Sequence, residues 1–148
     1  MEQKSINKDK YAKLVRNIDI NQLNLVELYS KKYVTALYNN ENLTKIKVDI
    51  KHRSGLKSVQ DNSFITEFKT EIFSETEKGE KIFNIFVVYE IVYSLRENID
   101  LNELKDEVEF FVFRNVPVNI WPYIRETVSS VTTKMGFQPL VLEPLKIF

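Results

Sequence analysis

Residues 81–95 set the strongest constraint on how this chain can fold. Every second position, from Phe83 through Ile85 and Val87 to Leu95, is apolar or aromatic. Such a period of two predicts a β-strand, because successive side chains point to opposite faces. The positions between them also carry Ile82, Phe86, Val88 and Val92. A strand that is apolar on both faces must be covered on both sides, by its own chain or by another subunit.

Three earlier runs have the composition of strands, at 23–38, 45–53 and 63–73. The run 45–53 alternates regularly, with Ile46, Val48, Ile50 and His52 on one face and charged residues on the other, which predicts one buried and one wet face. Uneven alternation at residues 30–32 suggests a bulge or a bend. Turns are expected at 39–42 and 74–79, and a polar loop at 54–62. With 81–95 these runs predict a four-stranded antiparallel β-meander.

Helical patterns flank the predicted sheet. Residues 8–19 have apolar side chains at helical spacing and predict a short amphipathic helix, which docks on its own domain or serves as a partner-binding arm. Asp100 with Glu103 fits a helix start, and the apolar repeat lasts to about Phe113. After a loop at 114–119, a last helix begins near Pro122 and ends at Gly136.

This order of elements predicts an α+β fold with two helices packed on one face of the sheet. The chain has 148 residues, which suits one domain and one core. We therefore expect a single domain over residues 1–148, with residues 1–22 as an N-terminal helical extension.

The formal net charge is zero, which argues against a general nucleic-acid partner. There is no cysteine, so disulfides and thiolate metal sites are excluded. The first residues lack the apolar core of a signal peptide, and the apolar run 82–95 is too short to span a bilayer. We expect a soluble cytoplasmic protein without membrane insertion.

Patterns for catalysis are weak. Only three glycines occur, and neither GxGxxG nor GxxxxGK[ST] is present. One histidine without cysteine cannot make the usual zinc site. Carboxylates gather at 75–80 and 103–109, where a solvated surface explains them. We predict no enzyme, catalytic residue, metal or cofactor; an enzyme or small-molecule site would require His52 to converge with carboxylates in a closed pocket.

The aromatic residues are compatible with a binding function as well as with core packing. The chain has ten Phe, seven Tyr and one Trp. Core packing explains most of them, but rings near loops could line an apolar groove for an extended peptide. Main-chain hydrogen bonds from an open sheet edge would add affinity without sequence preference.

The segment 119–144 carries a recognisable pattern. It reads Trp121-Pro-Tyr-Ile-Arg-Glu126, then Ser129-Ser-Val-Thr-Thr133, then Phe137-Gln-Pro-Leu-Val-Leu-Glu-Pro144. This resembles the C-terminal half of the SecB export-chaperone family, and the order of upstream strands and helix extends the resemblance to roughly residues 23–144.

The resemblance implies a cytoplasmic homotetramer, a dimer of dimers, that holds unfolded polypeptides in apolar grooves without hydrolysing ATP. In this sequence the matching candidates for client binding are Ile46, Val48, Ile50, Trp121, Tyr123 and Phe137. A link to protein export through the translocation ATPase SecA is one expectation. The alternative is a SecB-like chaperone or adaptor dedicated to one partner, such as an antitoxin.

Several positions depart from the family pattern. Gln138 replaces the first proline after the phenylalanine, and we expect the chain to lack the family's final C-terminal helix. SecA-docking relatives use acidic side chains on the sheet, whereas the first predicted strand offers Lys31 and Lys32 with only Glu27 nearby. The hand-over to SecA is therefore less supported than the chaperone class.

Overall fold

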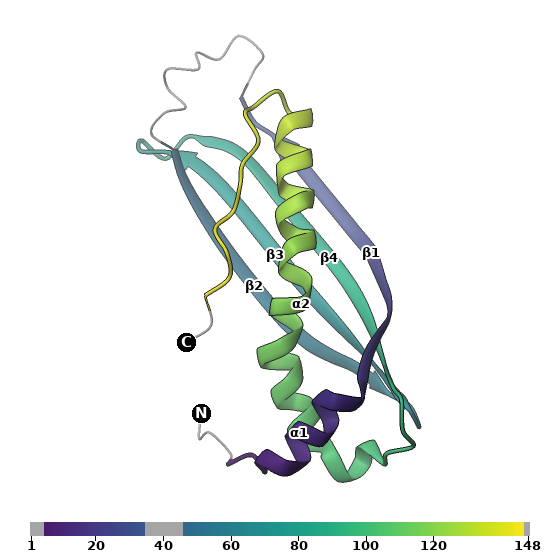
Figure 1. The fold of residues 1–148 in the computed structure, drawn as a ribbon. Helices are drawn as coiled ribbons and strands as arrows, with labels where there is room; N and C mark the ends of the chain where they lie inside the picture. The colour runs from purple at the N-terminus through teal and green to yellow at the C-terminus, as the bar shows by residue number, and fades with distance from the viewer. Residues whose placement is uncertain (1–4, 35–45, 147–148) are drawn as a thin grey trace.

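A computed structural model describes residues 5–34 and 46–146. One antiparallel sheet forms a layer, and a long helix lies along one of its faces (Figure 1). The elements are α1 (Lys8–Asn17), β1 (Ile18–Lys32), β2 (Ile46–Val59), β3 (Ser63–Thr76), β4 (Lys81–Leu95), the 3-10 turn η2 (Leu101–Leu104) and α2 (Lys105–Lys134). The predicted α+β class, the four antiparallel strands and the N-terminal helix are confirmed.

The strand order corrects the predicted meander. The sheet runs β1-β4-β3-β2, so the first strand pairs with the last instead of with the second. The cause is the composition of β4: a strand that is apolar on both faces is best placed in the interior of the sheet. β1 supplies its second neighbour, pairing from Ile18↔Leu95 to Lys32↔Phe83.

The helical layer also differs from the prediction of two helices with a loop at 114–119. A single helix spans Lys105–Lys134 and contains both Pro117 and Pro122. An interior proline costs roughly 3 kcal/mol because it removes a backbone hydrogen bond and its ring clashes with the preceding turn. Here Val116, Ile120 and Ile124 are fully buried at helical spacing across the predicted break. Burial of this stripe offsets the cost of the prolines.

Element boundaries differ in smaller ways. α1 ends at Asn17, so residues 18–22 belong to β1 and not to a helical extension. β2 continues to Val59 through the predicted polar loop, because an edge strand tolerates polar side chains and Gly55 pairs with Glu67. The bulges in β1 lie between Ile20 and Gln22 and between Leu25 and Glu27, earlier than expected. The predicted turn at 39–42 falls outside the described residues.

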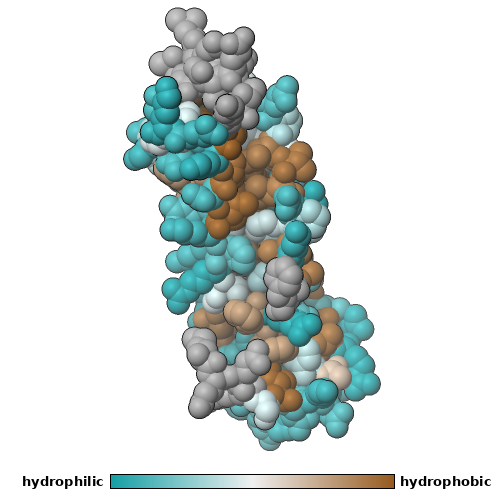
Figure 2. Space-filling model, turned by 90° about the vertical axis from the view of Figure 1, so that its left-hand side faces the viewer, coloured by the Kyte–Doolittle hydropathy of each residue, from teal (hydrophilic) through white to brown (hydrophobic). Residues whose placement is uncertain are grey.

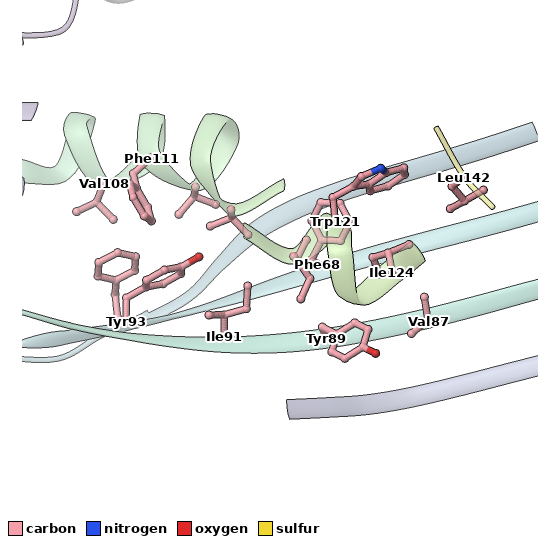
Figure 3. Close-up of a cluster of buried hydrophobic side chains, with 14 of the residues drawn as sticks. Phe68, Val87, Tyr89, Ile91, Tyr93, Val108, Phe111, Trp121, Ile124 and Leu142 are labelled. Carbon is pink, nitrogen blue, oxygen red and sulfur yellow. The ribbon is translucent and has the colours of Figure 1, made fainter. Parts of the chain in front are cut away.

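The core fills the space between the sheet and α2 (Figure 3). Tyr93 stacks on Phe64 at 5.1 Å between ring centroids and meets the edge of Phe111 at 5.0 Å. On β4 the residues facing α2 are all buried, which matches the apolar face predicted for 81–95. α2 packs mainly on β2, β3 and β4 and leaves β1 at the uncovered side of the sheet (Figure 1).

Local signals at the helix ends were predicted correctly. Asp100 accepts a hydrogen bond from the Asn102 N–H at 3.0 Å and opens η2. At the other end Gly136 has φ +89°, a conformation that favours glycine. The Gly136 N–H donates to the Thr133 carbonyl and the Phe137 N–H to the Thr132 carbonyl, which is a Schellman motif. The chain therefore turns back along α2.

The N-terminal helix docks on its own domain. Leu14 is fully buried, and the Tyr11 hydroxyl donates to Asn115 Oδ1 at 2.6 Å. The Tyr11 ring also meets the edge of Phe110 at 5.1 Å. These contacts tie α1 to the first half of α2 and support the first of the two predicted roles for this helix.

Candidate functional site

Three of the predicted client-binding residues form a row on β2. Ile46, Val48 and Ile50 pair with Thr76, Ser74 and Ile72 of β3, whose side chains are buried beneath the helical layer. Opposite residues of an antiparallel pair lie on the same face, so the row faces α2. Ile46 and Val48 are half-buried and Ile50 is 38% exposed, because β2 is an edge strand with no further strand beside it in the described chain.

His52 continues this row and joins it to Trp121. Its ring stacks on Phe68 at 5.5 Å and meets the edge of Trp121 at 5.8 Å. The histidine therefore packs as an aromatic side chain. Within residues 5–34 and 46–146, no group of three His, Cys, Asp or Glu side chains is arranged to hold a metal ion.

Trp121 is buried on the sheet side of α2 and is held by a polar contact. Its indole Nε1–H donates to the carbonyl oxygen of Glu143 at 2.8 Å. Four residues along the helix, the Arg125 Nε–H donates to the Leu142 carbonyl, also at 2.8 Å. Both acceptors belong to residues 137–146, which we call the C-terminal segment.

The C-terminal segment has no regular secondary structure and runs back along α2 on the side of β2 (Figure 1). A third hydrogen bond joins the Leu140 N–H to Thr132 Oγ1 at 2.9 Å. Leu142 is buried next to Trp121 and Ile124 (Figure 3), whereas the neighbouring Val141 is 66% exposed. Leu140, Leu142 and Leu145 pack on the same apolar cluster as Ile46 and Val48.

The surface on this side of the molecule is mixed. Figure 2 shows hydrophobic side chains gathered between hydrophilic ones on the side that carries β2 and the C-terminal segment in Figure 1. The partly or fully exposed Ile, Leu and Val residues of these two segments are Ile46, Val48, Ile50, Leu56, Val59, Leu140, Val141 and Leu145. We call the row of Ile46, Val48 and Ile50, which His52 joins to the buried Trp121, the β2 surface.

The structure places the other two candidates apart from the β2 surface. Tyr123 is 49% exposed and contacts Tyr89 of β4, with ring centroids 6.3 Å apart. Phe137 lies at the end of α2, where it meets Phe83 at 5.7 Å. Lys32 lies over the Phe137 ring at 4.9 Å and donates to the Met135 carbonyl at 2.7 Å. The six candidate residues therefore lie at three separate places in the structure.

A second apolar row was missed by sequence reasoning. Ile20, Leu25 and Leu28 of β1 pair with Tyr93, Tyr89 and Val87, so they face the helical side of the sheet. Each is between 42% and 50% exposed, because α2 does not cover β1. The bulges of β1 obscure its period of two, although Leu and Ile in a predicted edge strand were a usable signal. We call these residues the β1 surface.

Charged side chains line the β2 and β3 part of the sheet face turned away from α2, whereas β4 carries Ile82, Phe86, Val88 and Val92 on that face. Lys47 pairs with Glu75 and Lys51 with Glu71 across β2 and β3. Lys57 Nζ lies 2.9 Å from Glu90 Oε2, and this bond raises the pKa of the lysine. Basic residues thus follow β2, and Glu67, Glu71 and Glu75 follow the neighbouring strand β3.

One exposed ion pair closes the end of the sheet. Arg96 donates two hydrogen bonds, from Nε and NH2, to the two Asp19 carboxylate oxygens, each at 2.7 Å. The bonds from Arg96 lower the pKa of Asp19 and raise that of the arginine. A bidentate pair of this kind fixes the start of β1 against the end of β4.

Comparison with known proteins shows to which family the chain belongs. Residues 16–147 match the SecB family, described as preprotein translocase subunit SecB. The chain belongs to the SecB family. No helix in the described part of this SecB-family chain is both long and apolar enough to cross a membrane.

Curated relatives agree with this assignment. A protein-export protein SecB of Orientia tsutsugamushi (strain Boryong) is 34% identical over 100 residues, which are 67% of this chain and 59% of that protein. One from Erythrobacter litoralis (strain HTCC2594) is 26% identical over 98 residues, 66% of this chain and 52% of its own length. The match therefore spans little more than half of these relatives.

A solved structure shows the same fold. The Mycobacterium tuberculosis Rv1957 SecB-like chaperone, determined in complex with a ChAD peptide from the Rv1956 HigA1 antitoxin, superposes with a TM-score of 0.80. The superposition covers 95% of this chain and 99% of that one at 15% identity. At this identity the likeness concerns the fold.

Proposed function

We propose that this SecB-family protein is a cytoplasmic, ATP-independent holdase that binds unfolded polypeptides. The observation that carries the proposal is the β2 surface, an apolar row left half open at the edge of a sheet. Burying client side chains there stabilises the complex by roughly 25 cal/mol per Å² of apolar area. No bond in the client needs to be broken, so no catalytic group is required.

Two partners are compatible with this function. The protein-export names of the curated relatives support a client on its way to translocation through SecA. The antitoxin peptide bound by the structural relative supports a chaperone dedicated to one partner. Lys47 and Lys51 stand opposite Glu75 and Glu71 on the exposed sheet face, so an acidic docking surface for SecA is partly neutralised. This charge pattern favours the dedicated partner.

We further propose a homotetramer built as a dimer of dimers. The β1 surface supports self-association, because its exposed leucine and isoleucine side chains lie on an edge strand. The opposite edge strand, β2, carries Lys47, Lys51, Arg53 and Lys57. Lysines on an edge strand discourage further pairing. We therefore place the contact between protomers at β1.

The test is suppression of aggregation by matched variants. Ile50→Asp puts a charge into the β2 surface at a side chain that is 38% exposed, so the fold should tolerate it. Leu56→Asp, at 39% exposure on the same strand and face, is the control. Light scattering of a chemically unfolded client should show suppression by the wild type and the control, with a loss of about tenfold or more in Ile50→Asp. If Ile50→Asp suppressed client aggregation as well as Leu56→Asp does, the β2 surface would not be the client-binding site. If the wild type did not suppress aggregation, the holdase proposal would be wrong. If the protein suppressed the aggregation of one native partner and not that of the generic client, the dedicated role would be established.

A further inference from the structure

The C-terminal segment is bound to α2 in the way a peptide ligand is bound. The donors Trp121 Nε1 and Arg125 Nε reach main-chain carbonyl oxygens, those of Glu143 and Leu142. The acceptor Thr132 Oγ1 receives the main-chain N–H of Leu140. None of these three contacts uses a side chain of the segment, so any polypeptide could make them in the same place.

Side-chain burial in the segment is confined to alternate positions. Leu142 is 3% exposed and Leu140 is half-buried, while Val141 between them is 66% exposed. Such alternation is typical of an extended chain that rests on an apolar surface. The buried leucines join the apolar cluster that also contains Ile46 and Val48 of the β2 surface.

We propose that Trp121, Arg125 and Thr132 form a main-chain-binding ladder, which residues 140–143 occupy until an extended segment of an unfolded client displaces them. The inference rests on the chaperone function proposed above and gives Trp121 a role beyond an apolar contact. The ligand class is an extended polypeptide with an apolar side chain to replace Leu142. The free protein keeps its ladder satisfied, because an unpaired indole N–H or guanidinium N–H beside the core would be costly.

The composition of the chain permits a direct readout. It has one tryptophan and no cysteine, so a single introduced cysteine can be labelled uniquely. Val141→Cys places a bimane dye on the exposed side of the segment, two residues from Glu143, whose carbonyl Trp121 binds. Tryptophan quenches nearby bimane, so emission should be lower while the segment is docked on α2 than after it leaves.

The experiment titrates the labelled full chain with reduced, carboxymethylated α-lactalbumin, which stays unfolded. Emission should rise in parallel with client binding measured independently by anisotropy of a labelled client. Leu142→Ala in the same background should raise emission without client and lower the dissociation constant for the client by roughly threefold or more, because the competing segment is weakened. Glu143→Ala is the control: its side chain is exposed and its main-chain carbonyl remains, so neither quantity should change.

Two results would overturn the inference. One is saturating client binding with no rise in emission. The other concerns Leu142→Ala with an unchanged circular dichroism spectrum: its segment is released, but its affinity for the client is unchanged or weaker. The titration of the otherwise native labelled chain decides the question even if Leu142→Ala does not fold. Absence of client binding in the unlabelled wild type would instead overturn the chaperone proposal, and is distinguishable because emission then stays low without any complex.

Discussion

Tyr93 is a buried phenol at the centre of the core. It has no exposed surface, and its hydroxyl accepts a hydrogen bond from Asn119 Nδ2 at 3.0 Å. Burial raises the pKa of Tyr93 from 10.0 to about 12. The folded state therefore holds this proton more tightly than the unfolded state does. The resulting stability is complete below pH 10.0 and is lost as pH rises toward about 12.

We therefore expect Tyr93→Phe to flatten the alkaline loss of stability. A two-unit shift corresponds to roughly 3 kcal/mol, and the lost hydrogen bond costs about 1 kcal/mol at neutral pH. Urea midpoints of both proteins, measured from about pH 8 to about pH 11, should converge as pH rises. Parallel curves would show that another group causes the alkaline loss.

Lys32 joins the end of β1 to the end of α2. Its ammonium donates to the Met135 carbonyl, one of the groups at a helix C-terminus that lack a helical partner, and also lies over the Phe137 ring. Lys32→Met should reduce the free energy of unfolding by about 1–2 kcal/mol.

The neighbouring Lys31 provides the control for this change. Its ammonium lies over the Tyr33 ring, 5.0 Å from the centroid, and the side chain points to the opposite face of the sheet, away from the end of α2. Denaturant melts of Lys31→Met should match the wild type within about 0.5 kcal/mol. Equal effects of the two substitutions would mean that loss of charge alone, and not the contact at the end of α2, determines the result.

At the scale of elements, two prolines inside α2 lower the stability of the helix, and one of them can be replaced without loss of packing. Pro117 is buried within the helix, whereas Pro122 is exposed on its surface. Pro122→Ala removes no buried contact and restores a backbone donor, so it should stabilise the fold by about 1–3 kcal/mol. Pro117→Ala should gain less, since it also leaves unfilled space in the core. Thermal melts of the two variants check the order, and a destabilised Pro122→Ala would show that the helix requires the bend at this point.

The strands and the caps were predictable because their signals are local. Period-two alternation located β3 and β4, and Asp100 and Gly136 marked turns through their own backbone preferences. The β1–β4 pairing and the unbroken α2 were not predictable in this way, because they depend on which surfaces bury each other. Alternation in 45–53 predicted that Ile46, Val48 and Ile50 share one face of β2, whereas their role in client binding remains a prediction. The β1 surface was missed because bulges interrupt its period, and the main-chain contacts of the C-terminal segment leave no pattern in side chains.

At the scale of the whole molecule, the two sheet edges differ in chemistry. Leu25 on β1 is 50% exposed, and its strand offers apolar side chains along the edge. If the proposed contact at β1 forms, Leu25→Lys should dissociate the proposed tetramer into smaller species at the same protein concentration, because a buried charge without a partner is costly.

Leu56→Lys on β2 is the matched control, since Leu56 is 39% exposed on the other edge strand. Size-exclusion chromatography with mass measurement should show a reduced mass for Leu25→Lys alone. A monomeric wild type would contradict the proposed self-association, and a reduced mass only for Leu56→Lys would place the protomer contact away from β1.

This difference between the edges also limits growth. Two copies that meet through β1 about a two-fold axis expose only the lysine-bearing β2 at both ends of the joined sheet. Strand addition then stops, because each remaining end repels a further sheet. The joined sheet would therefore have a fixed width, and neither of its ends would template a filament.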